Sequence, residues 1–185
     1  MLSHTPGNTV SNLSSSRALR DVTNRHEGCS YSAAAVGEVN VVSKMKETSA
    51  VIGGEGNGGV IYPELHYGRD ALVGVALFLT LLAKSGKKMT ELKKTYPAYS
   101  IAKNKVELTP GLDVDAILNK MKEKYSDQQV TDIDGVKIDF PDCWVHLRKS
   151  NTEPIIRIYS EASDMEKAVC LGEEIRSIIE SESSL

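Results

Sequence analysis

The sequence predicts an α/β fold in which a mixed sheet with helices on both faces is followed by an α+β domain with an antiparallel sheet. Strand and helix patterns alternate over the first half, whereas several strand patterns follow one another in the second half. The alternation stops at the polar segment 85–88, and Pro97 ends the short helix pattern that comes next. We therefore expect a first domain over residues 1–96 and a second over residues 97–185.

In the first half, short apolar runs of strand length alternate with segments whose apolar residues recur at helical spacing. The expected strands are 9–12, 30–35, 50–52 and 60–62, and the expected helices are 17–26, 38–46 and 69–84. The longest apolar run, Ala71 to Ala83, is too short to span a bilayer and is typical of a buried helix.

In the second half, strand candidates stand between amphipathic helices, which favours an antiparallel sheet. The expected strands are 99–107, 130–133, 136–140, 144–148 and 155–161, and the expected helices are 89–96, 114–125 and 165–179. The acidic segment Asp132–Gly135 lacks the further acidic residue and the spacing of a calcium loop, so we expect a turn there and no metal site.

The bulk composition is that of an ordinary soluble protein, with 41% hydrophobic and 25% charged residues. The net charge of −3 and the isoelectric point of about 5.8 disfavour a nucleic-acid-binding module, which usually carries a basic field. Three cysteines without motif spacing favour free thiols and a cytoplasmic location. No signal peptide and no membrane segment are expected.

The segment from Arg148 to Pro154, with Arg157 three positions further on, places cationic, hydroxyl and amide side chains between two strand patterns. Arginine forks match phosphate oxygens, and hydroxyl groups and the N–H groups of a tight turn add further donors. An ordinary surface hairpin would more often carry Asn-Gly or Asp-Gly. The local chemistry therefore predicts a phosphate site.

A second segment, Gly53 to Gly59, contains five glycines in seven positions after a short apolar run. Backbone without side chains can approach a ligand closely, and the remaining Glu55 and Asn57 suit the hydroxyls of a sugar. Glycine-rich loops after strands are common, however, and this one lacks the spacing of nucleotide-binding loops. The residues alone leave both interpretations open.

Together, the two segments resemble the alpha-D-phosphohexomutase superfamily of phosphoglucomutases, phosphomannomutases and phosphoglucosamine mutases. Gly54–Gly59 is similar to the sugar-binding loop in the third of the family's four domains, and Arg148–Pro154 is similar to the phosphate-binding loop in the fourth. The resemblance covers essentially the whole chain. It implies that residues 1–96 are the third domain and residues 97–185 the fourth, with a sheet similar to that of the TATA-binding protein.

The family moves a phosphoryl group between the 1- and 6-oxygens of a hexose phosphate, by way of a phosphoserine and a bisphosphate intermediate. Its serine and its Asp-rich magnesium loop lie in the first two domains, and Ser3–Pro6 matches the serine loop only faintly. The resemblance therefore implies the C-terminal part of such an enzyme. We expect this part to bind without catalysing, to hold no catalytic residue and no metal, and to depend on the missing N-terminal domains and on Mg²⁺ in the full-length enzyme.

The resemblance also assigns the ligand contacts, and the expected ligand is a hexose phosphate or inorganic phosphate. It assigns sugar hydroxyls to Glu55 and Asn57, and phosphate to Arg148, Ser150, Asn151, Thr152 and Arg157. Some members carry histidine at the positions of Glu38 and Gly59, so the roles of those histidines cannot be transferred to this chain. Glu38 is instead expected to open a helix, where its charge suits the dipole.

Two other functions remain open from the sequence. A stand-alone sugar-phosphate-binding or regulatory module would have the same two loops and no chemistry. Nucleic-acid binding by the C-terminal sheet rests on fold analogy alone and would require clustered basic residues. The preferred hexose, whether glucosamine, glucose or mannose phosphate, is not readable from these residues.

Overall fold

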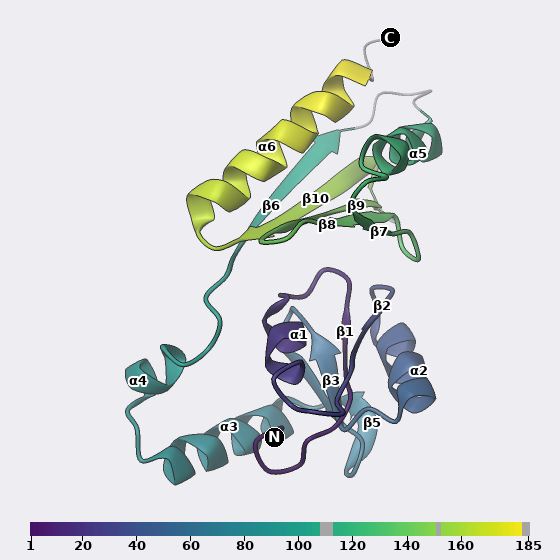
Figure 1. Cartoon of the computed structure of the whole chain (residues 1–185). Coiled ribbons are helices and arrows are strands. Elements are labelled where there is room, and N and C mark those ends of the chain that lie inside the picture. Colours follow the sequence, from purple (N-terminus) through teal and green to yellow (C-terminus); the bar gives the residue numbers. More distant parts are fainter. Residues whose placement is uncertain (108–112, 151–152, 183–185) are drawn as a thin grey trace. The chain divides into compact units, whose positions relative to one another are not determined.

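A computed structural model of the chain describes residues 1–107, 113–150 and 153–182 (Figure 1). The chain divides into two compact units, Met1–Ala98 and Tyr99–Leu185. Each unit has a five-stranded sheet of its own.

The first unit contains a mixed sheet with the strand order β2-β1-β3-β4-β5. Its strands are β1 (Thr9–Asn12), β2 (Tyr31–Ala34), β3 (Ile52–Glu55), β4 (Gly59–Tyr62) and β5 (His66–Arg69). Strand β1 runs parallel to β2 and β3, whereas β3, β4 and β5 pair in antiparallel fashion. The predicted mixed sheet is therefore confirmed.

Helices cover both faces of this sheet, as predicted (Figure 1). The helices of this unit are α1 (Ala18–Thr23), α2 (Glu38–Thr48), α3 (Ala71–Ser85) and α4 (Met89–Lys93). Helices α1 and α2 pack on the strands, α3 contacts β4, and α4 contacts α3. The core lies between α2 and the sheet, where Val41 and Met45 pack with Val10, Ala34 and Ile61. Burial of these apolar side chains is the main source of stability for this layer.

The glycine-rich segment is part of the sheet and not a loop that follows a strand, which corrects the expectation of a strand at 50–52. Strand β3 begins at Ile52 and continues through Gly53 and Gly54 to Glu55. A Cβ at Gly53 would lie 2.4 Å from Sδ of Met45, and a Cβ at Gly54 would lie 2.2 Å from the carbonyl oxygen of Gly59. Close packing of helix and hairpin therefore accounts for these two glycines.

The segment before α3 also differs from the expectation of a helix over 69–84. His66–Arg69 forms the edge strand β5, which a polar sequence without apolar alternation does not reveal. Helix α3 begins after Asp70, whose side chain caps it by accepting a hydrogen bond of 3.0 Å from the N–H of Val73. Arg69 is thus a strand residue and not a helix residue.

Helix α3 is apolar, but the prediction that it is buried is wrong. None of its residues is buried, and Leu72, Val75 and Leu79 are 80%, 53% and 53% exposed. The helix contacts β4 along one side, where Gly74 lies against Val60. Among the residues described, no helix combines the length and the apolarity needed to cross a membrane.

The second unit contains an antiparallel sheet with the strand order β6-β10-β9-β8-β7, and the predicted antiparallel sheet is confirmed. Its strands are β6 (Ser100–Glu107), β7 (Gln129–Thr131), β8 (Val136–Asp139), β9 (Trp144–Lys149) and β10 (Ile155–Ala162). Helices α5 (Val114–Lys124) and α6 (Met165–Glu182) lie on one face of the sheet (Figure 1). This layering agrees with the expected TATA-binding-protein-like fold.

One core joins the two helices to that face. Its apolar side chains come from α5, α6, β8, β9 and β10, with Met121, Ile138, Leu147, Ile158 and Ile175 among the most deeply buried. The acidic segment is the turn before β8, as expected. Gly135 in this turn has a φ of +71°, and a Cβ there would lie 2.1 Å from the carbonyl oxygen of Leu147, so only glycine fits.

Candidate functional site

The glycine-rich hairpin projects from the edge of the first sheet at which the parallel strands end. In its register Gly54 pairs with Val60 and Glu55 pairs with Gly59. The side-chain oxygen of Asn57 accepts a hydrogen bond of 3.1 Å from the N–H of Gly59, which ties the turn to itself. Ligands of α/β sheets bind at this edge, outside the carboxyl ends of the strands.

The Glu55 carboxylate is held by donors from three other segments of the unit. Its Oε1 accepts from Nδ2 of Asn12 at 2.9 Å and from the N–H of Gly37 at 3.2 Å. Its Oε2 lies 3.4 Å from Nη1 of Arg69. Gly37 precedes α2, so the carboxylate also lies at the positive end of a helix dipole. Tertiary contacts therefore fix the position of the Glu55 carboxylate.

Arg69 is itself anchored by Glu38, the first residue of α2. The backbone N–H of Arg69 donates to Oε1 of Glu38 at 3.1 Å, and its side-chain Nε donates to Oε2 at 2.8 Å. These two hydrogen bonds from Arg69, the backbone one first, hold the pKa of the Glu38 carboxyl below its usual value. Glu38 opens a helix as expected, and it binds Arg69 as well.

A hollow of about 300 Å³ adjoins the hairpin. The hairpin forms one wall, and the stretch from the end of β1 to the start of α1 forms another, with Ser11, Ser15, Ser16 and Leu19. The hydroxyl of Ser15 donates to Oδ1 of Asn12 at 2.8 Å, which links this wall to the Glu55 carboxylate. The sequence analysis assigned no ligand role to Ser15 and Ser16, which directly precede the expected helix 17–26.

In the second unit, Arg148 and Arg157 lie side by side at the root of the predicted phosphate loop. Arg148 in β9 and Arg157 in β10 are directly opposite partners, so both side chains leave the same face of the sheet. The N–H of Ser150 donates to the carbonyl oxygen of Ile155 at 2.9 Å and closes the base of the loop. Asn151 and Thr152, which the sequence also assigns to this site, fall outside the described residues.

Both arginines already have carboxylate partners. Nε of Arg148 lies 3.3 Å from Oδ1 of Asp134, and Nη2 of Arg157 donates to Oε2 of Glu153 at 3.0 Å. Because the Arg157–Glu153 pair is largely exposed, it contributes little to stability and can exchange with another anion.

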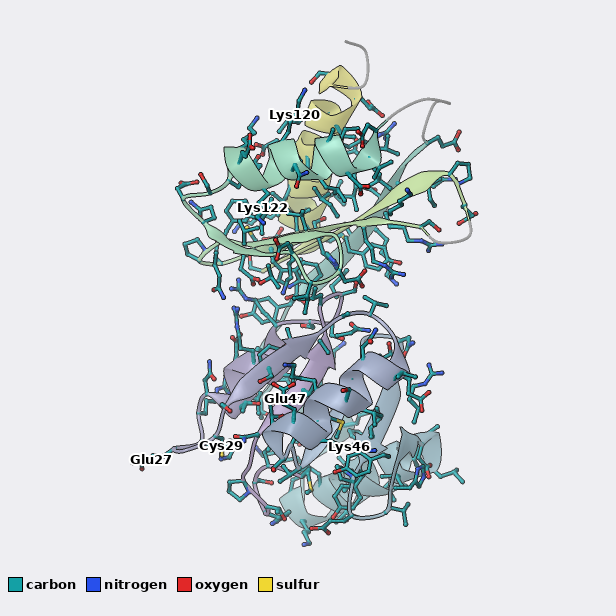
Figure 2. The ribbon with its side chains drawn as sticks, turned by 90° about the vertical axis from the view of Figure 1, so that its right-hand side faces the viewer. Glu27, Cys29, Lys46, Glu47, Lys120 and Lys122 are labelled. Carbon is teal, nitrogen blue, oxygen red and sulfur yellow. The ribbon has the colours of Figure 1, made fainter. Side chains whose placement is uncertain are left out.

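A hollow of about 430 Å³ lies next to Arg148. Its charged lining is balanced, with three cations (Lys122, Arg148, Lys149) and three acids (Asp115, Asp132, Asp134). Lys122 projects from α5, which also carries Lys120, and it pairs with Asp132 (Figure 2). Since the hollow has no excess of positive charge, anion binding has to come from the fork geometry of the arginine and from loop donors.

His146, on the same strand as Arg148, is hydrogen-bonded through Nε2 to the carbonyl oxygen of Asp134 at 2.7 Å. Burial lowers the pKa of this imidazole below its ordinary value, and the carbonyl of Asp134 opposes that effect. His146 therefore braces the turn that carries the carboxylate partner of Arg148. The sequence analysis placed it within the expected strand 144–148 and gave it no other role.

The two units have the architecture of the C-terminal domain pair of the phosphohexomutase class: a mixed α/β domain that contains a glycine-rich hairpin, then a domain with an antiparallel sheet. Residues 1–99 match the profile described as "Phosphoglucomutase/phosphomannomutase, alpha/beta/alpha domain III". Residues 88–178 match "Phosphoglucomutase/phosphomannomutase, C-terminal domain". The chain belongs to the phosphoglucomutase/phosphomannomutase family and carries its domains III and IV.

Curated relatives agree with this assignment. A phosphoglucosamine/phosphogalactosamine mutase of Sulfurisphaera tokodaii is 44% identical over 147 residues, which cover 78% of this chain and 32% of the relative. A phosphoglucomutase/phosphomannomutase of Thermococcus kodakarensis is 40% identical over 164 residues, covering 88% of this chain and 35% of that protein. The chain thus spans about a third of the length of these relatives.

Solved structures show the same fold. A putative phosphomannomutase from Thermus thermophilus superposes with a TM-score of 0.71 at 27% identity, over 94% of this chain and 36% of that one. An N-acetylphosphoglucosamine mutase of Aspergillus fumigatus, solved with GlcNAc-6P and magnesium, gives a TM-score of 0.61 at 14% identity, over 94% of this chain and 38% of that one. The second likeness shows the fold alone.

Across residues 1–107, 113–150 and 153–182, no three His, Cys, Asp or Glu side chains converge as metal ligands would. The acidic turn at Asp132–Gly135 directs its carboxylates to Lys122 and Arg148 instead. No chemical step is therefore assigned to a metal held by these residues.

Proposed function

We propose that this chain is the C-terminal, substrate-binding half of a phosphohexomutase that interconverts hexose 1-phosphate and hexose 6-phosphate. The hexose is glucosamine, glucose or mannose, and the reaction passes through a phosphoserine and a bisphosphate. The observation that carries the proposal is the pair of arginines at the root of the 150–154 loop, in a chain that belongs to this family. Two adjacent guanidiniums on one sheet face suit a dianionic phosphate.

In the second unit, Arg148 and Arg157 bind the distal phosphate of the substrate. Each arginine exchanges its carboxylate partner for phosphate oxygens, and the hydroxyl of Ser150 adds a donor next to Arg148. Asn151 and Thr152 complete the set by family resemblance. The exchange lets the loop release and rebind phosphate, which the reorientation of a bisphosphate requires.

In the first unit, Glu55 and Asn57 bind the sugar hydroxyls. An ionised carboxylate has about four lone-pair sites. Three donors already contact Glu55, so its Oε2 retains room for one hydroxyl. Asn57 uses its oxygen within the turn, and its Nδ2 group is the donor for a second hydroxyl.

The chemistry itself belongs to domains that these residues do not include. The phosphoryl-carrying serine and the magnesium ligands are parts of the first two domains of the family, and this chain supplies no catalytic residue. A cytoplasmic location is part of the same proposal, in keeping with Cys29, Cys143 and Cys170, which form no disulfide in the part of the chain that the structure describes.

The test is a titration of the ¹⁵N-labelled chain with glucose 6-phosphate and, separately, with inorganic phosphate. We expect the hexose phosphate to shift amide signals of both Gly54–Gly59 and Arg148–Ser150, and inorganic phosphate to shift the second group alone. Absence of any shift at Arg148–Ser150 with either ligand would overturn the proposal. Turnover of glucose 1-phosphate by this chain alone, followed by ³¹P NMR, would contradict its assignment as the non-catalytic half.

A stand-alone sugar-phosphate-binding or regulatory module is the second candidate, because the two loops are complete without a catalytic group. The two functions differ in whether the gene continues upstream into the serine-loop and Asp-rich domains. Sequencing of the upstream reading frame decides between them.

A further inference from the structure

The placement of Arg69 is not explained by the sugar-binding roles proposed for Glu55 and Asn57. It ends β5, and its guanidinium reaches the carboxylate that is proposed to hold the sugar. Its side chain is 46% exposed although it makes two ion pairs. A side chain that is anchored at its base and open at its tip is suited to contact a ligand.

Glu38 fixes the base of the Arg69 side chain by accepting two hydrogen bonds from this residue. One carboxylate oxygen of Glu38 takes the backbone N–H of Arg69, and the other takes the side-chain Nε. The contact joins residues 31 positions apart and fixes both the strand end and the base of the guanidinium. Nε is the donor to Glu38, whereas Nη1 of the same guanidinium lies 3.4 Å from Oε2 of Glu55.

The second requirement is space, which Gly59 provides. Gly59 stands directly opposite Glu55 in the hairpin register. A Cβ at this position would lie 2.5 Å from Cδ and 3.0 Å from Cγ of Arg69. The arginine stem therefore crosses the hairpin where any side chain on residue 59 would block it.

The result is a contact with one particular oxygen of Glu55. Oε1 is occupied by Asn12 and Gly37, whereas Oε2 contacts Arg69 alone among the residues that the structure describes. Within the same described residues, Nη2 of Arg69 has no partner at hydrogen-bonding distance. Oε2 of Glu55 and the terminal end of the Arg69 guanidinium are thus neighbours, 3.4 Å apart through Nη1.

We propose that Arg69 is a further ligand-binding residue of the hairpin, positioned by Glu38 and admitted by Gly59. A sugar hydroxyl that donates to Oε2 of Glu55 accepts from a terminal N–H of Arg69. Such a donor–acceptor pair selects a hydroxyl, which has both functions, over an ether oxygen or a bare anion. This inference rests on the proposed function, since it takes the hairpin as the sugar site.

The test uses the change in affinity for glucose 6-phosphate relative to inorganic phosphate, measured on the intact chain by NMR titration. We expect Arg69→Met to lower hexose-phosphate affinity by about tenfold, as for loss of a charge-assisted hydrogen bond, with phosphate affinity unchanged. Arg69→Lys keeps the charge without the fork and restores only part of the loss. Glu38→Gln lowers affinity less and removes the protection of the Arg69 Nε–H signal from exchange.

Lys44→Met is the matched control. Lys44 lies on α2, the helix that begins at Glu38, and it forms an exposed ion pair with Glu47, which Figure 2 labels. The substitution removes a cation from the unit without touching the hairpin and leaves both affinities unchanged. Thermal unfolding of every variant confirms that the first unit is folded. If Arg69→Met does not fold, the affinities of Arg69→Lys provide the test instead.

Glu55→Gln separates the two ways in which the inference can fail. If Glu55→Gln removes the preference for hexose phosphate while Arg69→Met and Arg69→Lys retain it, the role of Arg69 is overturned and the sugar site stands. If the unchanged chain does not distinguish the two ligands at Gly54–Gly59, the sugar site itself fails, and the inference fails with it.

Discussion

The two ligand loops hold their key charges in opposite ways. In the hairpin, Glu55 is 5% exposed at its side chain and is fixed by an amide, a backbone N–H and a guanidinium from distant segments. In the phosphate loop, Arg157 is 39% exposed and is held by a carboxylate only four residues away. One charge is locked by tertiary structure, and the other is held by a local contact that water and salt can replace.

This difference matches what each ligand group requires. A hydroxyl is a weak, neutral ligand, so its acceptor has to be oriented beforehand, which lowers the entropic cost of binding. A phosphate is a strong anion that can displace an exposed carboxylate from an arginine. Under the proposed function, the hairpin would therefore give specificity and the loop reversible affinity.

Arg148→Ala is expected to have the largest effect on binding. It removes the less exposed guanidinium, and loss of a charge-assisted hydrogen bond weakens binding by about 1.5–3 kcal/mol. Calorimetric titration with inorganic phosphate measures the loss. Arg176→Ala is the control, since Arg176 lies on α6 and pairs only with Glu173 and Glu180 among the described residues. Equal phosphate affinity in Arg148→Ala and in the unchanged chain would show that the loop is not the phosphate site.

Gly54→Ala tests whether the hairpin is rigid, as the comparison requires. Its Cβ would lie 2.2 Å from the backbone oxygen of Gly59, and overpacking of this kind destabilises a protein by about 1–3 kcal/mol. Gly56→Ala is the matched substitution in the same hairpin, where the nearest atom is 3.2 Å away, so we expect a smaller loss. Urea unfolding of both variants gives the two values. If Gly56→Ala destabilises the protein more than Gly54→Ala does, the hairpin is less rigid than the close contact at Gly54 indicates.

Glu153→Gln tests whether the phosphate loop holds its arginine loosely. Removal of this carboxylate frees Arg157 and takes away a negative charge beside the ligand, so phosphate affinity should rise. Exposed pairs contribute about 0.2–1 kcal/mol, which corresponds to a gain of up to about fivefold. Because salt screens exposed charges, the gain should shrink at high ionic strength, for example in about 1 M KCl. A loss of affinity would mean that Glu153 orients Arg157 instead of competing for it.

The smallest expected effect is the dependence of stability on pH that Glu38 gives to the first unit. The folded pKa of Glu38 lies below its usual value of 4.5, so its contribution is present above about pH 4.5 and is lost as the pH falls through the folded value. The difference in melting temperature between the unchanged chain and Glu38→Gln should therefore be larger at about pH 7 than at about pH 3. A difference in melting temperature that does not change with pH would show that the hydrogen bonds from Arg69 to the Glu38 carboxylate do not stabilise the first unit.

The sequence predicted both sheets because their signals are local. Apolar alternation marks the strands around Val145 and Ile158, and helical spacing marks the helix that contains Ile117 and Met121. The predicted helix stripe and strand faces meet in one core. The strand ends at Gly53 and Gly54 were missed because glycine carries no strand preference, and the packing of Gly53 against Met45 is a tertiary contact.

The candidate site was predictable only in part. Glu55 and Arg148 stand in short motifs that a family resemblance identifies, whereas Arg69 stood in a segment that was predicted to be helical. Its link to Glu38 spans 31 positions, and no pattern in the sequence reveals it. The prediction that helix α3 is buried failed for a different reason. An apolar composition predicts that a helix is covered, but it does not identify the surface that covers it.

The locked state of Glu55 has a consequence for chemical labelling of this protein. Carbodiimides activate a carboxyl group only when the reagent can reach it, and an oxygen that already accepts two hydrogen bonds reacts poorly. Glu153, which is 55% exposed at its side chain, should be amidated early, and Glu55, at 5%, should be among the last carboxyls to react. A mass spectrum taken during such a reaction would therefore rank the two loops by reactivity, without any ligand present.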